Sequence, residues 1–147
     1  MARIKISFPV DFIFKTKITI RVTDVNYGGH VGNDSILSIM HEVRLQFLKH
    51  LGFKSEVDID ENVGLIVADV AVQYKAESFH GDELEIRVAV QDFNKYGFDM
   101  LYQLINVRSG SEVAVGKTGI VCVDYKEKRV VPIPEILTQK INKSQRV

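Results

Sequence analysis

Five polar residues with the side chains needed for acid–base or hydrolytic chemistry lie close together near the amino-terminal end: Asp24, Asn26, His30, Asn33 and Asp34. They stand directly before a segment with a helical pattern. The first amides of a helix have no intrahelical acceptor and carry a partial positive charge, so they would polarise a carbonyl oxygen. A nearby carboxylate that positions or deprotonates water would then make ester or thioester hydrolysis feasible. Ordinary loops contain the same residue types, so composition alone leaves both interpretations open.

The loop that carries these residues joins a predicted strand to a predicted helix. Residues 16–23 alternate between apolar and polar side chains, which indicates a half-buried strand. From 35 to about 51, apolar residues recur every three or four positions and cover roughly half of the helix circumference. We expect Asp34 or Asn33 at the N-cap and Gly52 just past the carboxyl end. So wide an apolar stripe predicts a helix wrapped by a sheet.

The remaining chain reads as strands joined mostly by turns. Residues 63–74 are apolar on both faces, which predicts a central strand, interrupted by Asp69. Further strands are expected at 84–91, 98–107 and 112–125, the last two forming a hairpin, and a short polar helix follows Pro134. Antiparallel strands around one long helix predict an α+β fold. A doubly wound parallel sheet is excluded, since it needs a crossover helix after nearly every strand.

Composition limits the classes of function. The length of 147 residues fits a single domain, 1–147, and 46% apolar with 26% charged residues is typical of a globular protein. Nineteen basic residues balance 19 acidic ones, which argues against a nucleic-acid partner. No apolar run is long enough for a membrane span, and residues 1–16 lack a signal-peptide pattern. We therefore expect a cytoplasmic protein without nucleic-acid or membrane partners.

The sequence predicts neither a metal nor a redox cofactor. The histidines show no ligand spacing with other donors, and no Gly-x-Gly-x-x-Gly follows a strand. The single cysteine, Cys122, lies in an apolar run and is expected to be a buried thiol.

Residues 21–44 resemble the opening motif of hotdog-fold acyl-CoA thioesterases of the 4-hydroxybenzoyl-CoA thioesterase type. That motif reads, in outline, Asp-x-Asp-x-x-Gly-His-Val-Asn-Asn, followed by a helix with Glu-x-Arg. The positions that match in register are Asp24, Gly29, His30, Val31, Asn33, Glu42 and Arg44. Residues 74–84 resemble the strand-turn-strand that follows the helix in that family.

The resemblance implies a hotdog fold, with an antiparallel sheet wrapped around one long central helix. It also implies hydrolysis of a fatty-acyl or aromatic acyl thioester by activated water, with coenzyme A only as part of the substrate. The family forms homodimers and often homotetramers, so we expect a homo-oligomer with its sites at a subunit interface. A sheet with one helix leaves a face and an edge to cover, which favours the same conclusion.

The resemblance also assigns candidate site residues. Substrate contacts fall on Tyr27, Gly29, Val31, Gly32 and Asn33, although Tyr27 is equally suited to packing the loop. The family's usual catalytic carboxylate position is occupied by Asn26, and Gly32 replaces the first Asn of the motif's pair. An amide cannot act as a base, but it can polarise a carbonyl or orient water. His30 is expected to order the loop.

Another acid must then activate water, and three are available. Glu42 lies on the polar face of the helix, and Asp69 interrupts an apolar strand, where a carboxylate is costly unless it is paired or functional. A salt bridge or a solvent-facing position in the sheet is an equally open interpretation of Asp69. Asp24 is nearest in sequence, but it is equally suited to pinning the loop through backbone N–H groups. We rank Glu42 and Asp69 ahead of Asp24 and expect a partly buried acid with a raised pKa.

Two other functions remain open. Asp24, Asn26 and His30 partly match the Asp-x-Asn-Pro-x-His motif of R-specific enoyl-CoA hydratases, but Tyr27 replaces the proline and His30 lies one residue too far along. A non-catalytic hotdog protein that binds acyl groups is the other alternative, because Asn26 removes the usual carboxylate.

Overall fold

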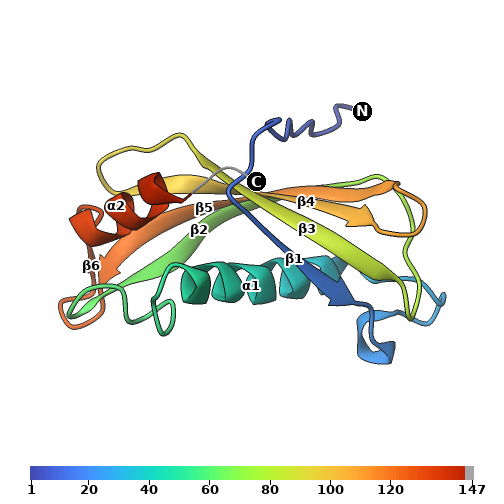
Figure 1. The fold of residues 1–147 in the computed structure, drawn as a ribbon, viewed down its shortest axis with the longest axis horizontal. Helices are drawn as coiled ribbons and strands as arrows, with labels where there is room; N and C mark the ends of the chain where they lie inside the picture. Colours follow the sequence, from blue (N-terminus) through green and yellow to red (C-terminus); the bar gives the residue numbers. More distant parts are fainter. Residues whose placement is uncertain (145–147) are drawn as a thin grey trace.

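The structure is a computed structural model and describes residues 1–144. Its elements, in chain order, are β1 (Phe14–Thr19), the short 3₁₀ turn η1 (Val22–Asp24), α1 (Asn33–His50), β2 (Val63–Tyr74), β3 (Glu83–Gln91), β4 (Gly97–Asn106), β5 (Glu112–Asp124), β6 (Arg129–Val130) and α2 (Glu135–Lys143). Figure 1 shows the sheet curving over α1, which runs along one face of it. The predicted fold, an antiparallel sheet around one long helix, is confirmed.

The six strands form one antiparallel sheet in the order β1-β3-β4-β5-β2, with β6 beside β5. The edges of the main sheet are therefore β1 and β2. The face toward α1 is called the inner face below, and the opposite face is called the outer face. The short helix α2 adds two buried side chains, Leu137 and Ile141, to the core on the inner face.

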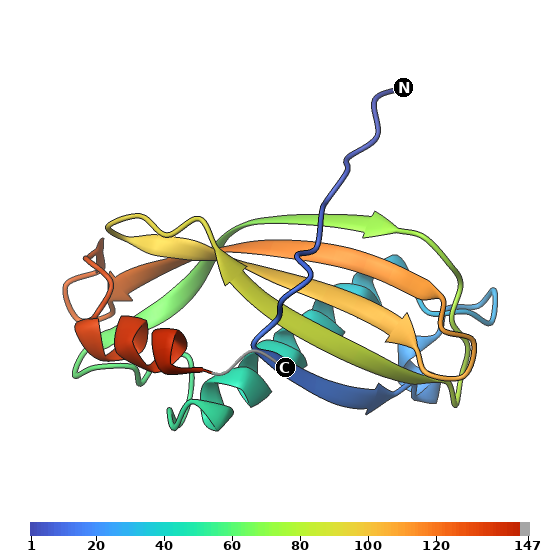
Figure 2. The same ribbon diagram turned by 45° about the horizontal axis from the view of Figure 1, so that its top comes forward.

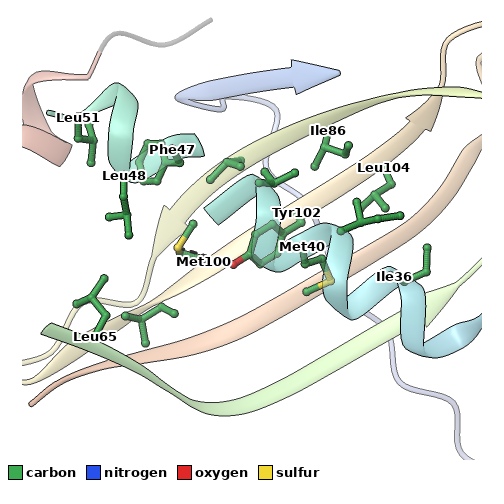
Figure 3. Packing of buried hydrophobic residues seen from close by; sticks show 14 of the residues in the cluster. Ile36, Met40, Phe47, Leu48, Leu51, Leu65, Ile86, Met100, Tyr102 and Leu104 are labelled. Atoms are coloured by element: carbon green, nitrogen blue, oxygen red, sulfur yellow. Dashed lines mark hydrogen bonds between the residues drawn. The ribbon is translucent and has the colours of Figure 1, made fainter. Parts of the chain in front are cut away.

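The helix α1 is held by its apolar stripe, as its spacing predicts. Ile36, Met40, Val43 and Phe47 are almost fully buried against alternate residues of the strands. In Figure 3, Ile36, Met40 and Phe47 of α1 lie on the same side of the sheet as labelled side chains of β3 and β4, among them Ile86 and Tyr102. At Gly116 the helix comes so close that an added Cβ would lie 2.6 Å from the Met40 sulfur. Gly116 therefore sets how closely the sheet can wrap the helix.

Of the two predicted ends of α1, the carboxyl end is confirmed and the N-cap is not. Gly52 follows the helix with a φ of +98°, the left-handed conformation expected just past the carboxyl end. The predicted N-cap is wrong, because the helix begins at Asn33 with Gly32 at the N-cap position, and no side chain caps it. Asn33 and Asp34 are therefore the first two residues of the helix itself.

The prediction of a central strand at residues 63–74 is also wrong. β2 is an edge strand, paired only with β5, and its apolar residues Ile66, Val67, Val70 and Tyr74 are exposed. Apolar side chains on both faces of a strand indicate burial, but no other part of residues 1–144 covers these side chains. The prediction for Cys122 is confirmed: the thiol is buried, and burial raises its pKa to about 11.

Candidate active site

The loop before α1 is folded back on itself by short backbone contacts. The Asn26 N–H donates to the His30 carbonyl oxygen at 2.9 Å, and the Gly29 N–H donates to the Asn26 carbonyl oxygen at 2.9 Å. Gly29 has a φ of +85°, which explains the glycine at this turn. Val31 donates its N–H to the Ser78 carbonyl oxygen at 2.8 Å, which ties the loop to the segment before β3. The loop therefore has a defined shape.

The amino-terminal end of α1 opens next to this loop. The Gly32 N–H donates to the Asp24 carbonyl oxygen at 3.1 Å, and the N–H groups of Ser35 and Ile36 donate to the Gly32 carbonyl oxygen at 3.1 and 3.4 Å. The amides of Asn33 and Asp34 are the ones in this turn for which helix geometry supplies no acceptor. They are the groups that would polarise a carbonyl oxygen.

Asn26 stands beside this helix end. Its Oδ1 accepts the Gly28 N–H at 2.9 Å, so the oxygen is used by the loop and the Nδ2 group is left to donate to a substrate. A Cβ added at Gly32 would lie 2.7 Å from Asp34 Oδ1 and 3.9 Å from Asn26 Cβ. Asn26 and Asp34 therefore flank the same glycine. The carboxylate that the structure brings beside Asn26 is thus Asp34, which the sequence analysis grouped with the chemically suited loop residues but did not rank among the acids that could activate water.

Three grooves run along α1. The β1 groove, about 530 Å³, lies between α1 and β1 and contains Asp24, Ser38, His41, Glu42 and Gln46. The β2 groove, about 280 Å³, lies between α1 and β2 and is lined by Leu37, Ser38, Met40, His41, Arg44, Val67, Val70 and Thr118. The loop groove, about 240 Å³, lies at the amino-terminal end of α1 and includes His30, Val31, Asn33 and Tyr74. Together they surround the exposed side of the helix.

Asp24 and Glu42 share the β1 groove but differ in their surroundings. Asp24 is buried, and its Oδ2 accepts the Arg21 backbone N–H at 2.8 Å, so it pins the loop. Glu42 is exposed and accepts a hydrogen bond from the Gln46 side-chain amide at 2.9 Å. Of these two acids, Glu42 is the one that a ligand in the groove can reach freely.

The expectation of a partly buried Asp69 with a raised pKa is wrong. Asp69 lies on the outer face, away from α1, at an irregularity in the pairing of β2 with β5. Its side chain is 65% exposed and accepts hydrogen bonds from Lys117 Nζ at 2.6 Å and from the Gly119 N–H at 3.0 Å. The hydrogen bond from Lys117 is the main reason why the pKa of Asp69 is lowered. Within one chain the sheet separates Asp69 from Glu42, so the two do not meet.

The residues expected to contact substrate are distributed unevenly. Tyr27 is fully exposed at the tip of the loop, whereas Val31 is buried in the core and reaches the loop groove with one side. Gly32 lies at the helix start, and Asn33 accepts a hydrogen bond on its carbonyl oxygen from the Tyr74 hydroxyl at 3.0 Å. Among the five residues expected to contact substrate, Asn33 combines a backbone N–H without an intrahelical acceptor with a position in the loop groove.

A buried polar chain beside the β2 groove was not foreseen. Arg44 is buried, and its guanidinium lies 3.3 Å from the Glu56 carboxylate and 3.4 Å from the Tyr102 hydroxyl. Tyr102 in turn contacts the Thr118 hydroxyl at 2.8 Å, and His41 contacts Glu56 at 2.7 Å. Burial by itself lowers the pKa of Arg44, but the contacts with Tyr102 and Glu56 outweigh this effect. The pKa of Arg44 is therefore raised above its ordinary value, and the guanidinium stays charged.

The buried polar chain of side chains joins α1, β4, β5 and the segment after the helix. Arg44 is part of the Glu-x-Arg motif, which was a signal in the sequence, but the position of Glu56 twelve residues later carried none. Arg44 Nε is buried and lacks a well-aligned hydrogen bond, although it lies within ion-pair distance of Glu56. Across residues 1–144, no three acidic, histidine or cysteine side chains are placed to hold a metal ion. In the same residues, no helix combines the length and apolarity that a membrane crossing needs.

Comparison with known proteins gives consistent results. A family model described as the thioesterase-like superfamily matches residues 20–141. A 1,4-dihydroxy-2-naphthoyl-CoA hydrolase from Thermosynechococcus vestitus is 28% identical over 124 residues, which cover 81% of this chain and 82% of that protein. The acyl-CoA thioester hydrolase YbgC from Escherichia coli is 21% identical over 123 residues, covering 84% and 91% of the two chains.

A solved structure agrees in fold. The 1,4-dihydroxy-2-naphthoyl-CoA thioesterase from Synechocystis superposes with a TM-score of 0.81 over 90% of this chain and 96% of that one, at 19% identity. The predicted hotdog fold is thus confirmed by both its topology and its structural relatives.

Proposed function

Because the chain belongs to the thioesterase-like superfamily, we propose that it hydrolyses acyl-CoA thioesters, with a fatty-acyl or aromatic acyl group. The observation that carries this proposal is the helix start: the unsatisfied amides of Asn33 and Asp34 open beside Asn26 in a loop of defined shape. These groups suit an oxyanion that develops on a thioester carbonyl. The names of the related proteins, hydrolases of aromatic and other acyl-CoA thioesters, support the same reaction.

In the proposed mechanism, the thioester carbonyl oxygen lies at the amino-terminal end of α1. The amides of Asn33 and Asp34 and the Asn26 Nδ2 group donate to it, so negative charge that develops there is stabilised. The base removes a proton from water, which attacks the carbonyl carbon. The C–S bond then breaks, and the departing thiolate takes that proton back from the base, so the products are the carboxylic acid and the thiol of coenzyme A. Preorganised donors of this kind are each worth roughly 10²–10³ in kcat.

We propose Asp34 as the acid that activates water, because it is the carboxylate that flanks Gly32 together with Asn26. Glu42 is the second candidate and would act on a substrate that extends into the β1 groove. Asp24 is disfavoured since it is bound to the Arg21 N–H, and Asp69 is disfavoured since it lies on the other side of the sheet. His30 orders the loop through its contact from Nδ1 to the Val31 carbonyl oxygen at 3.3 Å.

The acyl group has a natural place in the β2 groove. Leu37, Met40, Val67 and Val70 give it apolar walls, and Thr118 and Arg44 lie at its polar side. Ligand pockets commonly combine apolar walls with a few polar groups in this way. Nothing else is needed for the reaction as proposed: coenzyme A enters as part of the substrate, without a separate cofactor.

We also propose a homodimer that forms through the free edge of β2. β2 pairs with β5 along one edge, and its other edge is open over residues 67–74, where Val67 and Val70 are exposed. Such an open edge is a template for pairing with a second copy. Pairing would extend the sheet and close the open side of the β2 groove. A homotetramer built from two such dimers, which the family resemblance favours, would need further contacts outside this edge. We expect the protein to work in the cytoplasm.

The activity is tested by following release of free thiol from a panel of aliphatic and aromatic acyl-CoAs. The proposal expects catalytic release with at least one of them. Hydration of crotonyl-CoA without thiol release would indicate the enoyl-CoA hydratase alternative. Tight binding of acyl-CoA with neither reaction would indicate the non-catalytic alternative, and each of these results would contradict the proposal.

A further inference from the structure

The segment before β1 crosses the outer face of the sheet. The Ile13 N–H donates to the Val88 carbonyl oxygen at 2.9 Å, at the β1 side of the sheet. Phe12 is buried against Ala89 and Leu101 on β3 and β4. Farther along, the Ile6 N–H donates to the Gln73 side-chain oxygen on β2 at 3.2 Å. The segment thus spans the sheet from one edge to the other.

The first five residues continue beyond the β2 edge. Figure 2 shows the chain crossing the sheet and then leaving it past β2, away from the rest of the molecule. These residues, 1–5, are called the arm. Ile4 on the arm is 58% exposed, so the segment that leaves the sheet past β2 carries an uncovered apolar residue.

A second copy paired on β2 would lie directly beneath the arm. Residues 63 and 65 of β2 already hydrogen-bond with the segment 56–60, so the open part of the edge is residues 67–74. If two β2 strands pair antiparallel over that part, Gln73 of one lies opposite Ala68 of the partner subunit. Neighbouring strands are about 4.8 Å apart, and an extended chain advances about 3.3 Å per residue. Ile4, two residues before Ile6, would therefore lie about 7 Å farther on, above the partner's sheet.

The outer face has an apolar groove at that place. Its volume is about 400 Å³, and it is lined by the apolar or aromatic residues Ile66, Val123, Tyr125 and Val130 and by the charged residues Asp124, Lys128 and Arg129. Ala68 and Ile66 are near neighbours on β2, so the groove lies close to where the partner's arm would arrive. A chain's own arm cannot fill its own groove. Gln73 and Ile66 are seven residues apart on β2, roughly 23 Å, whereas five extended residues span about 17 Å.

We propose that the arms are exchanged in the dimer, with Ile4 of each chain seated in the outer-face groove of the partner. The inference rests on the proposed β2 dimer and not on the thioesterase activity. It gives the dimer a contact on the outer face in addition to the strand pairing, and it explains why an apolar residue projects past the sheet edge.

The test is the dimer dissociation constant of the full-length chain, measured by sedimentation over a dilution series. Removal of residues 2–5, or the single change Ile4→Ser, should weaken the dimer tenfold or more. Val10→Ser is the matched control. Val10 is 96% exposed on the same segment, but it lies between Ile6 and β1 and therefore over the chain's own sheet, not past the β2 edge. This variant should leave the dissociation constant unchanged.

A cross-linking experiment checks the exchange directly. When chains carrying Ile4→Cys are mixed with chains carrying Val130→Cys, a disulfide should join the two kinds of chain, while Val10→Cys should not react. Cys122 is buried and does not compete. A wild-type monomer would overturn both the dimer and the arm exchange. A wild-type dimer whose dissociation constant is unchanged in both arm variants would overturn the arm exchange alone.

Discussion

Lys117 Nζ lies 2.6 Å from the Asp69 carboxylate on the outer face of the sheet, opposite α1. Lys117 Nζ also lies 3.2 Å from the Asp99 carboxylate, so Asp69 is one of two carboxylates that share this surface lysine. We expect Asp69→Asn to keep the wild-type kcat on acyl-CoA, because the side chain is remote from the helix start. A large loss of kcat at an unchanged melting temperature would contradict this assignment.

The same substitution has a predicted pH dependence. The pKa of Asp69 is lowered in the folded chain, so its ionised form is favoured by folding. The stabilisation is present above the ordinary carboxyl pKa of about 3.9 and is lost as the pH falls through the lowered value. The free energy of unfolding of wild type should exceed that of Asp69→Asn at pH 7, by at most about 1 kcal/mol because the pair is exposed. The difference should disappear at the acid end of a urea-denaturation series.

Asn26 and His30 should respond differently to substitution by alanine. Asn26 is exposed, and its side chain makes one contact within the loop, to the Gly28 N–H, so Asn26→Ala should fold normally and lose about tenfold or more in kcat. His30→Ala removes the contact to the Val31 carbonyl oxygen and should lower the melting temperature together with activity. Hydrolysis by Asn26→Ala at the wild-type rate would show that the loop is not where the carbonyl binds.

The identity of the base is tested by isosteric amides. Asp34→Asn should lose most of the wild-type kcat, since Asp34 flanks Gly32 together with Asn26. Its stability should fall by only about 0.3–1 kcal/mol, the usual contribution of an acid in the first turn of a helix. Glu42→Gln and Asp24→Asn, assayed on the same acyl-CoA panel, decide between the alternatives. Full activity in all three would mean that no side-chain carboxylate among them activates water.

The buried polar chain predicts a stability effect without a direct role in the reaction. Tyr102→Phe removes the hydroxyl that contacts Thr118 at 2.8 Å and Arg44 at 3.4 Å, and leaves both groups without that partner in the core. Such a loss costs about 1–3 kcal/mol. Tyr96→Phe is the control, because Tyr96 is a partly exposed residue in a turn. Equal free energies of unfolding for the two variants would contradict the role given to Tyr102.

Periodicity predicted the parts of the fold that depend on local pattern. The alternation in β3 and the wide stripe on α1 follow from which side chains face the core, so their positions were correct within one or two residues. The bounds of β2 were predicted correctly, but its place in the sheet was not, because apolar residues on both faces occur in a central strand and also in this edge strand with exposed apolar side chains. The sequence alone does not distinguish the two.

The site was predictable only in part. The loop residues Asn26 and His30 were found because they are close in sequence and precede a helix. Asp34 was assigned to the cap because the start of α1 was placed two residues too late. The pairing of Arg44 with Glu56 depends on how the segment after the helix folds back, which no local pattern encodes.

A single-turnover reaction in water enriched in ¹⁸O tests the central claim most directly. With enzyme in excess over an acyl-CoA substrate, the mass of the released acid is measured before any second turnover. Direct attack by activated water predicts one ¹⁸O atom in the acid from the first turnover. Unlabelled acid in that turnover, with the label appearing only later, would show attack by an enzyme carboxylate instead, and the absence of any released acid would contradict hydrolysis itself.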